Sequence, residues 1–358
     1  MNAFGSALQP VTTALRRMFD RPPFNSPWIA ALVLRYGLPT WFAIESVLGI
    51  AVAMQDTTYL FFDARLYLDA TRTWLAGEDP WSVQLAGNYF AAPPPTLLVF
   101  APLAPLPPDV GVAIVALAVI GGAIASVRLL RLPWWWLLFP PLVQSVLSAN
   151  VQSLIVPLIL INGGALAFIL KIYAGLPLLI LGRWRSLLVA TGVLIVTAPV
   201  LPWATYIDDF ALISQRLADQ SELTLPTGLL LLLSPLVVAA LYVVGRERAA
   251  WLVVPAIWPS QQFYYGTIAM PARSQIALAL IALPVPGNGL LALGVLAVVT
   301  LSRGDRGAWG SIRMPRPLAG ALGDPARETQ SLHESRRHVP GPGAGRTIGG
   351  RWRDATDC

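Results

Sequence analysis

The chain has 358 residues, of which 55% are hydrophobic and only 12% are charged, and its mean hydropathy is +0.61. Soluble domains usually contain about 25% charged residues, so this composition excludes an ordinary soluble protein and predicts an all-α bundle of membrane-spanning helices. The formal net charge of +6 does not indicate nucleic-acid binding, because the arginines gather in the C-terminal tail and beside apolar segments, where anionic lipid headgroups lie.

The N-terminal part of the chain predicts a cytoplasmic segment followed by a first membrane span. Residues 1–28 are polar to amphipathic and contain several arginines, which places them in the cytoplasm by the positive-inside rule. Residues 29–54 form an apolar stretch long enough to cross a bilayer, which takes about 20 residues. Within it, Glu45 is a carboxylate that needs a partner inside the protein. Residues 55–95 are polar and are predicted to form the first external loop.

The middle of the chain alternates between apolar segments and short polar breaks. Residues 96–106 are short and interrupted by prolines, which favours a helix that dips into the membrane interface without crossing. Further crossings are expected in residues 111–127, 133–148, 153–161 and 186–203. A polar corner occupies residues 150–152. Residues 163–181 hold Lys171 in their middle, and either one span or two half-helices that meet at Lys171 fits this segment.

The last third of the chain predicts a second external loop and the end of the membrane body. In residues 204–226 the apolar side chains recur at helical spacing, as expected for an amphipathic helix at the interface. Residues 227–244, 251–259 and 275–301 are apolar, and prolines near residue 285 can divide the last stretch. The membrane body thus comprises residues 29–302 with roughly ten spans and external juxtamembrane helices, in the plasma (inner) membrane. Residues 303–358, rich in Gly, Pro and Arg, are predicted to be a disordered cytoplasmic tail.

The residue types within the membrane body limit its chemistry. The two histidines, His333 and His338, lie in the tail, so no histidine metal site, Ser-His triad or histidine base is expected in the body. The sequence has no phosphate-binding loop and no dinucleotide motif. Acid–base work therefore falls to Asp or Glu, and neither a metal nor another cofactor is expected.

Asp63 is the first acid of a helical pattern in the first external loop, and two roles remain open for it. It can cap the helix, because a carboxylate accepts backbone N–H groups at a helix start, or it can act as a general base at the lipid–water boundary. The two roles are compatible. Asp69 lies between Arg65 and Arg72 at helical spacing, which favours an exposed ion pair.

Lys171 and a polar aromatic patch near residue 262 are the other candidates. Lys171 is the only lysine among 25 basic residues and lies in an apolar segment. Exposure to lipid would cost at least about 2.5 kcal/mol, so it should face a cavity or a partner. It can bind a phosphate or extend to the interface. Gln261, Gln262, Tyr264 and Tyr265 suit a sugar site, although an aromatic belt at the membrane interface explains the tyrosines equally well.

Five segments, taken together in this order, resemble the GT-C membrane glycosyltransferases, specifically glycosyltransferase family 87, the polyprenyl-phosphate mannosyltransferase-like group. They cover roughly residues 60 to 275 and read FFDARLYLDATRTWLAGEDPW, AAPPPTLLVFAPLAPLP, NVQSLIVPLILI, FILKIYAGLPLLILGRWR and IWPSQQFYYGTIAMP. The resemblance implies a GT-C fold with Asp63 as the catalytic base. Around it we expect the following residues to bind substrate: Arg65, Tyr67, Asp69, Gln152, Lys171, Gln262 and Tyr264. Two positions depart from the family pattern, with Val151 where a glycine is usual and Phe263 where a histidine is frequent.

The activity implied by this resemblance is the transfer of a hexose, such as mannose, from a polyprenyl-phosphate donor to a hydroxyl of a glycan or glycolipid acceptor on the external face. The lipid bilayer would hold the tail of the donor. Two alternatives stay open. One is a non-enzymatic transporter of lipid or solute, for which Glu45 and Lys171 are the matching features. The other is a degenerate family member with structural duties only. The acid-rich external loop and the lack of an internal repeat favour the enzyme.

Overall fold

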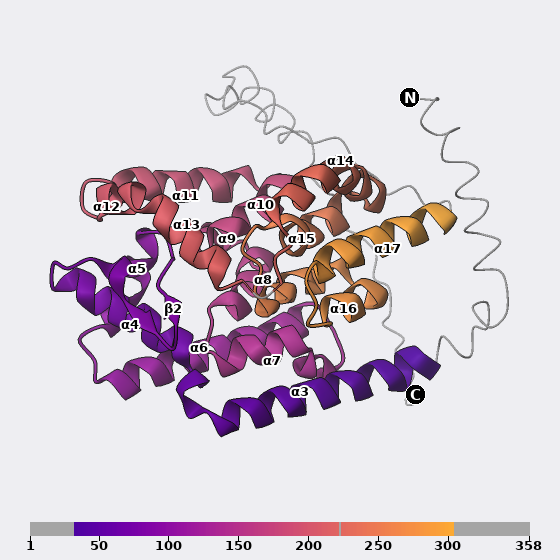
Figure 1. Ribbon diagram of the computed structural model, residues 1–358, viewed down its shortest axis with the longest axis horizontal. Helices are drawn as coiled ribbons and strands as arrows, with labels where there is room; N and C mark the ends of the chain where they lie inside the picture. The colour runs from indigo at the N-terminus through magenta and orange to yellow at the C-terminus, as the bar shows by residue number, and fades with distance from the viewer. Residues whose placement is uncertain (1–31, 222, 304–358) are drawn as a thin grey trace, which may run out of the picture. The chain divides into compact units, whose positions relative to one another are not determined.

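Helices make up nearly all of the regular structure in the computed structural model, which describes residues 32–221 and 223–303 (Figure 1). Within this part of the chain, the sheet structure is one antiparallel hairpin, in which β1 (Gln84–Leu85) pairs with β2 (Asn88–Tyr89). The prediction of an all-α protein is confirmed. The predicted N-terminal segment, residues 1–28, and the predicted tail beyond residue 303 lie outside the described residues.

Three of the described helices are long and apolar enough to cross a membrane, as expected for a membrane protein. They are α3 (Leu38–Gln55, with an apolar stretch that begins at Arg35), α6 (Pro108–Leu129) and α14 (Thr227–Val244). A fourth crossing is present if α7 (Pro140–Leu147) and α8 (Gln152–Leu160), which meet at an angle of 115°, count as one broken span. The number of roughly ten spans stays a prediction, because the other apolar segments form helices shorter than a bilayer crossing.

Burial separates these helices into two kinds. The apolar windows of α3 and α14 are only 17% and 11% buried inside the protein, whereas that of α6 is 50% buried. Both α3 and α14 therefore expose rows of leucine, valine and isoleucine side chains, which is the composition expected of a face in contact with lipid. Helix α6 packs against α4 (Phe62–Leu75), α7 and α8 and belongs to the interior of the bundle.

The remaining helices are short, and prolines and glycines account for many of their ends. They are α4 (Phe62–Leu75), α5 (Pro95–Phe100), α9 (Gly164–Leu170), α10 (Gly175–Ile180), α11 (Trp184–Thr197), α12 (Trp203–Asp208), α13 (Phe210–Asp219), α15 (Arg246–Ile257), α16 (Gln275–Ile281) and α17 (Asn288–Arg303). Single turns of other helix types are η1 (Val33–Gly37), η2 (Thr57–Tyr59), η3 (Pro80–Ser82), η4 (Ala101–Leu103), η5 (Trp134–Leu138), η6 (Ile172–Ala174) and the longer η7 (Phe263–Ala272). Residues 163–181 thus form two half-helices that meet at Lys171, and the last apolar stretch is divided into α16 and α17.

The interior of the bundle is centred on α15, which is buried along most of its length and packs against η7, α10, α14 and α17. Contact with α17 is especially close at Gly289. A Cβ atom added there would lie 1.8 Å from the carbonyl oxygen of Pro255. Only glycine therefore permits this approach of the two backbones.

The two predicted external loops meet in the structure, with α4, β2, α12 and α13 together at one end of the view (Figure 1). Arg216 of α13 donates a hydrogen bond to the backbone carbonyl of Trp81 at 3.0 Å, and its guanidinium lies 4.1 Å from the ring centre of Tyr89. The rings of Trp81 and Tyr206 are 5.2 Å apart. The second predicted external loop therefore packs on the first. Two loops can make such contacts when they lie on the same side of a membrane.

Candidate functional site

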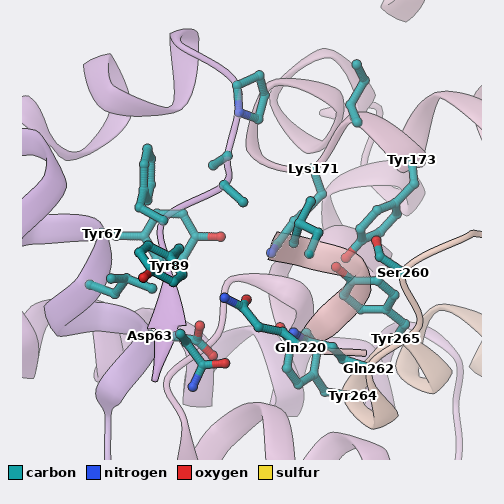
Figure 2. A pocket seen from close by; sticks show the side chains of 18 of the residues that line it. Asp63, Tyr67, Tyr89, Lys171, Tyr173, Gln220, Ser260, Gln262, Tyr264 and Tyr265 are labelled. Atoms are coloured by element: carbon teal, nitrogen blue, oxygen red, sulfur yellow. The ribbon is translucent and has the colours of Figure 1, made fainter. Parts of the chain in front are cut away.

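A pocket lies where α4, the β2 strand, η6, α13 and η7 come together (Figure 2). It contains about 690 Å³ of empty space, part of it open to solvent. Among the described residues that line it, Asp63 and Lys171 carry the charges, and the others are aromatic, aliphatic or neutral polar. The pocket thus combines one acid and one base from segments that are far apart in the chain.

Asp63 lies in the first turn of α4 but does not cap that helix. The residue before the helix, Phe61, has a left-handed backbone (φ 59°), and no side chain caps the α4 start. Instead, the N–H groups of Phe61 and Asp63 donate to the carbonyls of Leu147 and Ser148, at 2.8 and 3.0 Å. The capping interpretation of Asp63 is therefore wrong, because backbone carbonyls at the end of α7 satisfy these donors and leave the carboxylate free for other contacts.

The carboxylate of Asp63 is buried, with 6% of the residue surface exposed. The side-chain amide of Asn150 donates to its Oδ2 atom at 2.9 Å, and the hydroxyl of Ser148 also forms a hydrogen bond with it. Burial raises the pKa of Asp63 above the ordinary carboxyl value, while the charge of Lys171 and the hydrogen bonds from Asn150 and Ser148 oppose this rise. Burial is the larger effect, so the pKa of Asp63 remains above the ordinary carboxyl value.

Lys171 occupies the break between α9 and η6, where its backbone is extended (φ −146°, ψ 109°). Its amino group lies 5.6, 6.0 and 5.9 Å from the ring centres of Tyr67, Tyr264 and Tyr265, so cation–π attraction holds it in place. In the described part of the chain no ion pair joins it to Asp63. The prediction that Lys171 faces a cavity is confirmed, and its amino group is available to an anion in the pocket.

Four of the tyrosines that line the pocket are buried and neutral. Burial raises the pKa values of Tyr67, Tyr173, Tyr264 and Tyr265, and for the first three the rise is large. These side chains can donate and accept hydrogen bonds near neutral pH, but they do not act as bases there. Their rings support one another, since those of Tyr173 and Tyr265 lie 4.6 Å apart.

The structure brings together some of the predicted substrate-binding residues and not others. Tyr67, Gln262 and Tyr264 line the pocket with Asp63 and Lys171 (Figure 2). Gln152 is fully buried behind the pocket wall, where its side-chain oxygen accepts a hydrogen bond from the hydroxyl of Tyr173. It therefore supports a lining residue and is not itself a lining residue.

Arg65 and Asp69, which were also expected to bind substrate, do not line the pocket. Residues two apart on a helix point to nearly opposite sides, so Arg65 leaves α4 away from Asp63 and is exposed. Asp69 forms the predicted ion pair with Arg72 at 2.9 Å, and Arg72 also donates to the carbonyl of Ala104 at 3.0 Å. This face of α4 packs against η4.

Several lining residues were not predicted from the sequence. Tyr89 comes from the hairpin, Gln220 from the end of α13, and Trp258 and Ser260 from the segment before η7. No local pattern marks these side chains as members of one site. Asn150 is different, because it lies in the predicted polar corner at residues 150–152, and an isolated polar corner among apolar segments was a usable signal.

Glu45, the other candidate charge within the membrane body, has a partner in its own helix. The indole nitrogen of Trp41 donates to its carboxylate at 3.3 Å.

Among the described residues, no group of three or more His, Cys, Asp or Glu side chains is placed to hold a metal ion. The chemistry supported by the pocket is thus proton acceptance by a buried carboxylate beside a cation.

Comparison of the chain with protein-family models, with curated proteins and with solved structures finds no match. The resemblance to glycosyltransferase family 87 therefore rests on the five sequence segments, and the pocket geometry is the independent observation beside it.

Proposed function

We propose that this protein is an integral-membrane glycosyltransferase with the GT-C fold. It transfers a hexose, such as mannose, from polyprenyl phosphate to a hydroxyl group of a glycan or glycolipid. The observation that carries the proposal is that Asp63 and Lys171, which stand out in the sequence for separate reasons, line one pocket. Two elements that line it, α4 and η7, pack against the candidate membrane-crossing helices α6, α7 and α8. This is the arrangement that a lipid-linked donor and a water-soluble acceptor group require.

The reaction uses Asp63 as the general base. Its carboxylate takes the proton of the acceptor hydroxyl as the hydroxyl oxygen forms a bond to C1 of the sugar. The bond between C1 and the phosphate oxygen breaks, and its electron pair leaves with the polyprenyl phosphate, whose charge Lys171 stabilises. General-base catalysis of this kind contributes about 10²–10⁴-fold to a rate.

The raised pKa of Asp63 suits this role. A base is most effective when its pKa approaches the working pH, and burial moves Asp63 in that direction. Transfer needs the ionised carboxylate, so the rate should increase with pH through a midpoint that lies above the ordinary carboxyl range. Protonation below that midpoint removes the base.

The charge of the pocket supports a donor with a single phosphate. Lys171 is the one cationic side chain among the described residues that line it. A sugar attached through one phosphate carries one negative charge, which one ammonium group can balance. A diphosphate donor carries more charge and commonly needs a divalent metal or several basic groups.

The rest of the wall suits a polyhydroxylated acceptor. Asn88, Gln220, Ser260 and Gln262 offer neutral donors and acceptors, and aromatic faces lie between them. The buried side-chain nitrogen of Gln220 has no hydrogen-bond partner among the described groups. A sugar hydroxyl would satisfy this donor.

We also propose that the pocket opens on the external face of the plasma membrane and that the complete bundle has roughly ten spans. Both predicted external loops contribute lining residues, since Tyr89 belongs to the first and Gln220 to the second. Two loops that share one pocket must lie on the same side of the bilayer. The positive-inside distribution of arginine in the sequence assigns that side to the exterior.

Asp63→Asn tests the mechanism, because it keeps the shape of the side chain and removes the base. Membranes that contain the variant are supplied with labelled polyprenyl-phosphate hexoses, and incorporation into glycan and glycolipid is measured. We expect transfer to fall by about 10²–10⁴-fold. Asp69→Asn is the matched control on the other face of α4 and should transfer at the wild-type rate.

Transfer by Asp63→Asn near the wild-type rate would remove Asp63 from the mechanism. The transporter alternative is tested with the wild-type protein in liposomes. Movement of the labelled lipid across the bilayer, with no sugar transferred, would replace the glycosyltransferase assignment.

A further inference from the structure

We propose that Asn150 is a positioning residue for Asp63, and that the turn between α7 and α8 fixes the positions of both residues. The catalytic meaning of this inference rests on the function proposed above, whereas the positioning itself rests on contacts that do not depend on any reaction.

The backbone of Asn150 is fixed at the tip of this turn. Helix α7 ends at Leu147, the left-handed backbone of Ala149 (φ 52°) reverses the chain, and α8 departs at 115°. Asn150 is fully buried there. Its N–H donates to the carbonyl of Ser145 at 2.8 Å, and its own carbonyl accepts from the hydroxyl of Ser145 at 3.1 Å. The main chain of Asn150 thus has both of its polar groups engaged.

The side-chain amide of Asn150 has one favourable orientation. Its oxygen accepts a hydrogen bond from the backbone N–H of Gln152 at 2.9 Å, so its nitrogen must face the other way, where it donates to Asp63 at 2.9 Å. A rotation of the amide would place two donors together and an oxygen against the carboxylate. The N–H of Gln152 therefore selects the orientation in which Asn150 presents a donor to Asp63.

The backbone of Asp63 is hydrogen-bonded to the same turn. The hydrogen bonds from Phe61 and Asp63 to the carbonyls of Leu147 and Ser148 join the first turn of α4 to the end of α7. Main chain and side chain of Asp63 are thus held by residues 147–150. The position of the carboxylate in the pocket is consequently set by the α7–α8 turn as well as by the packing of α4.

The titratable groups that line the pocket with Asp63 are Lys171, Tyr67, Tyr89, Tyr173, Tyr264 and Tyr265. The four buried tyrosines are neutral, so Lys171 supplies the opposing charge, and Asn150 and Ser148 supply donors. A donor bonded to the ionised form lowers a carboxyl pKa. Loss of the Asn150 donor should therefore raise the pKa of Asp63 further.

The pKa of Asp63 can be followed by labelling with dicyclohexylcarbodiimide, which reacts with protonated carboxyl groups in apolar surroundings. The full-length protein in detergent is labelled over a range of pH, and modification of Asp63 is quantified by peptide mass spectrometry. For Asn150→Leu we expect the labelling midpoint to move to higher pH and the labelling rate at neutral pH to rise about tenfold, the effect of one hydrogen bond to a charged group.

Two further variants separate positioning from a general loss of structure. Asn150→Asp keeps the shape and the acceptor for Gln152 but places a second carboxyl beside Asp63, so labelling should again extend to higher pH. Asn288→Leu removes another buried asparagine, whose amide donates to the carbonyls of Ile281 and Leu283, and should leave the labelling of Asp63 unchanged.

A merely structural role for Asn150 predicts the opposite sign. A loosened fold would hydrate Asp63, reduce the effect of burial and lower its midpoint. An unchanged or lower midpoint in both Asn150 variants, with the protein still folded, would overturn the inference. No sugar donor takes part in the labelling, so this result is independent of whether Asp63→Asn abolishes transfer.

Discussion

The close crossing of α15 and α17 gives a prediction that does not depend on function. A Cβ atom at Gly289 would lie 1.8 Å from the carbonyl oxygen and 2.2 Å from the carbonyl carbon of Pro255. Such contacts essentially never fall below 3.0 Å, so the helices would have to separate by roughly 1 Å. The same carbonyl accepts a hydrogen bond from Gln261, next to the lining residue Gln262, and separation strains that bond as well.

The size of the effect follows from these contacts. Overpacking a well-packed interior costs about 1–3 kcal/mol, and weakening one hydrogen bond adds about 1 kcal/mol. Alanine is favoured over glycine inside a helix by at most about 1 kcal/mol, and Gly289 lies at the start of α17, where that gain is smaller. Gly289→Ala should therefore destabilise the protein by about 1–3 kcal/mol.

Thermal unfolding in detergent, followed by the fluorescence of the 13 tryptophans, measures this difference. A loss of this size should lower Tm by several degrees, at roughly 2–4 °C per kcal/mol for a large domain. Gly294→Ala, on the same helix and with no atom within 4 Å of the added Cβ, should leave Tm unchanged or raise it slightly. If Gly289→Ala melts at or above the Tm of Gly294→Ala, the proposed α15–α17 contact is wrong.

Two predictions concern the basic side chains around the pocket. Lys171→Gln removes the charge that lowers the pKa of Asp63, so carbodiimide labelling of Asp63 should extend to higher pH. Lys171→Arg keeps the charge and should keep the wild-type labelling profile. Identical profiles in the wild type and both variants would refute this coupling. Arg216→Met removes the bond to Trp81 and the contact with Tyr89, so amide hydrogen exchange in the β1–β2 hairpin should accelerate about tenfold. Unchanged exchange would show that α13 does not hold the hairpin.

Local properties of the sequence account for much of the fold. Sparse charge and long apolar segments predict membrane helices because each residue contributes to hydropathy independently of its neighbours in space. The amphipathic spacing in residues 210–219 predicts α13, and its apolar residue Ile213 is indeed buried. Prolines near residue 285 predict the division between α16 and α17, and the lone charge of Lys171 coincides with the break between α9 and η6.

The bend between α7 and α8 shows where local reasoning stops. Residues 133–148 and 153–161 were expected to be successive parts of separate crossings, joined by a polar corner. The structure instead has two short helices at 115°, and the corner points its carbonyls and the Asn150 amide at α4. Hydropathy reports whether a segment prefers lipid, but it does not report whether a short segment turns back before it crosses.

The sequence by itself determined that this is a helical membrane protein, that any acid–base work would fall to an aspartate or glutamate, and that Asp63 and Lys171 are unusual in their surroundings. The tertiary structure decided which side chains share a pocket. It places Arg65 and Asp69 outside the pocket lining, Gln152 behind the pocket wall, and Asn150 beside Asp63. These outcomes depend on contacts between segments remote in the chain, and a side chain's burial and partners are properties of those contacts that no local pattern contains.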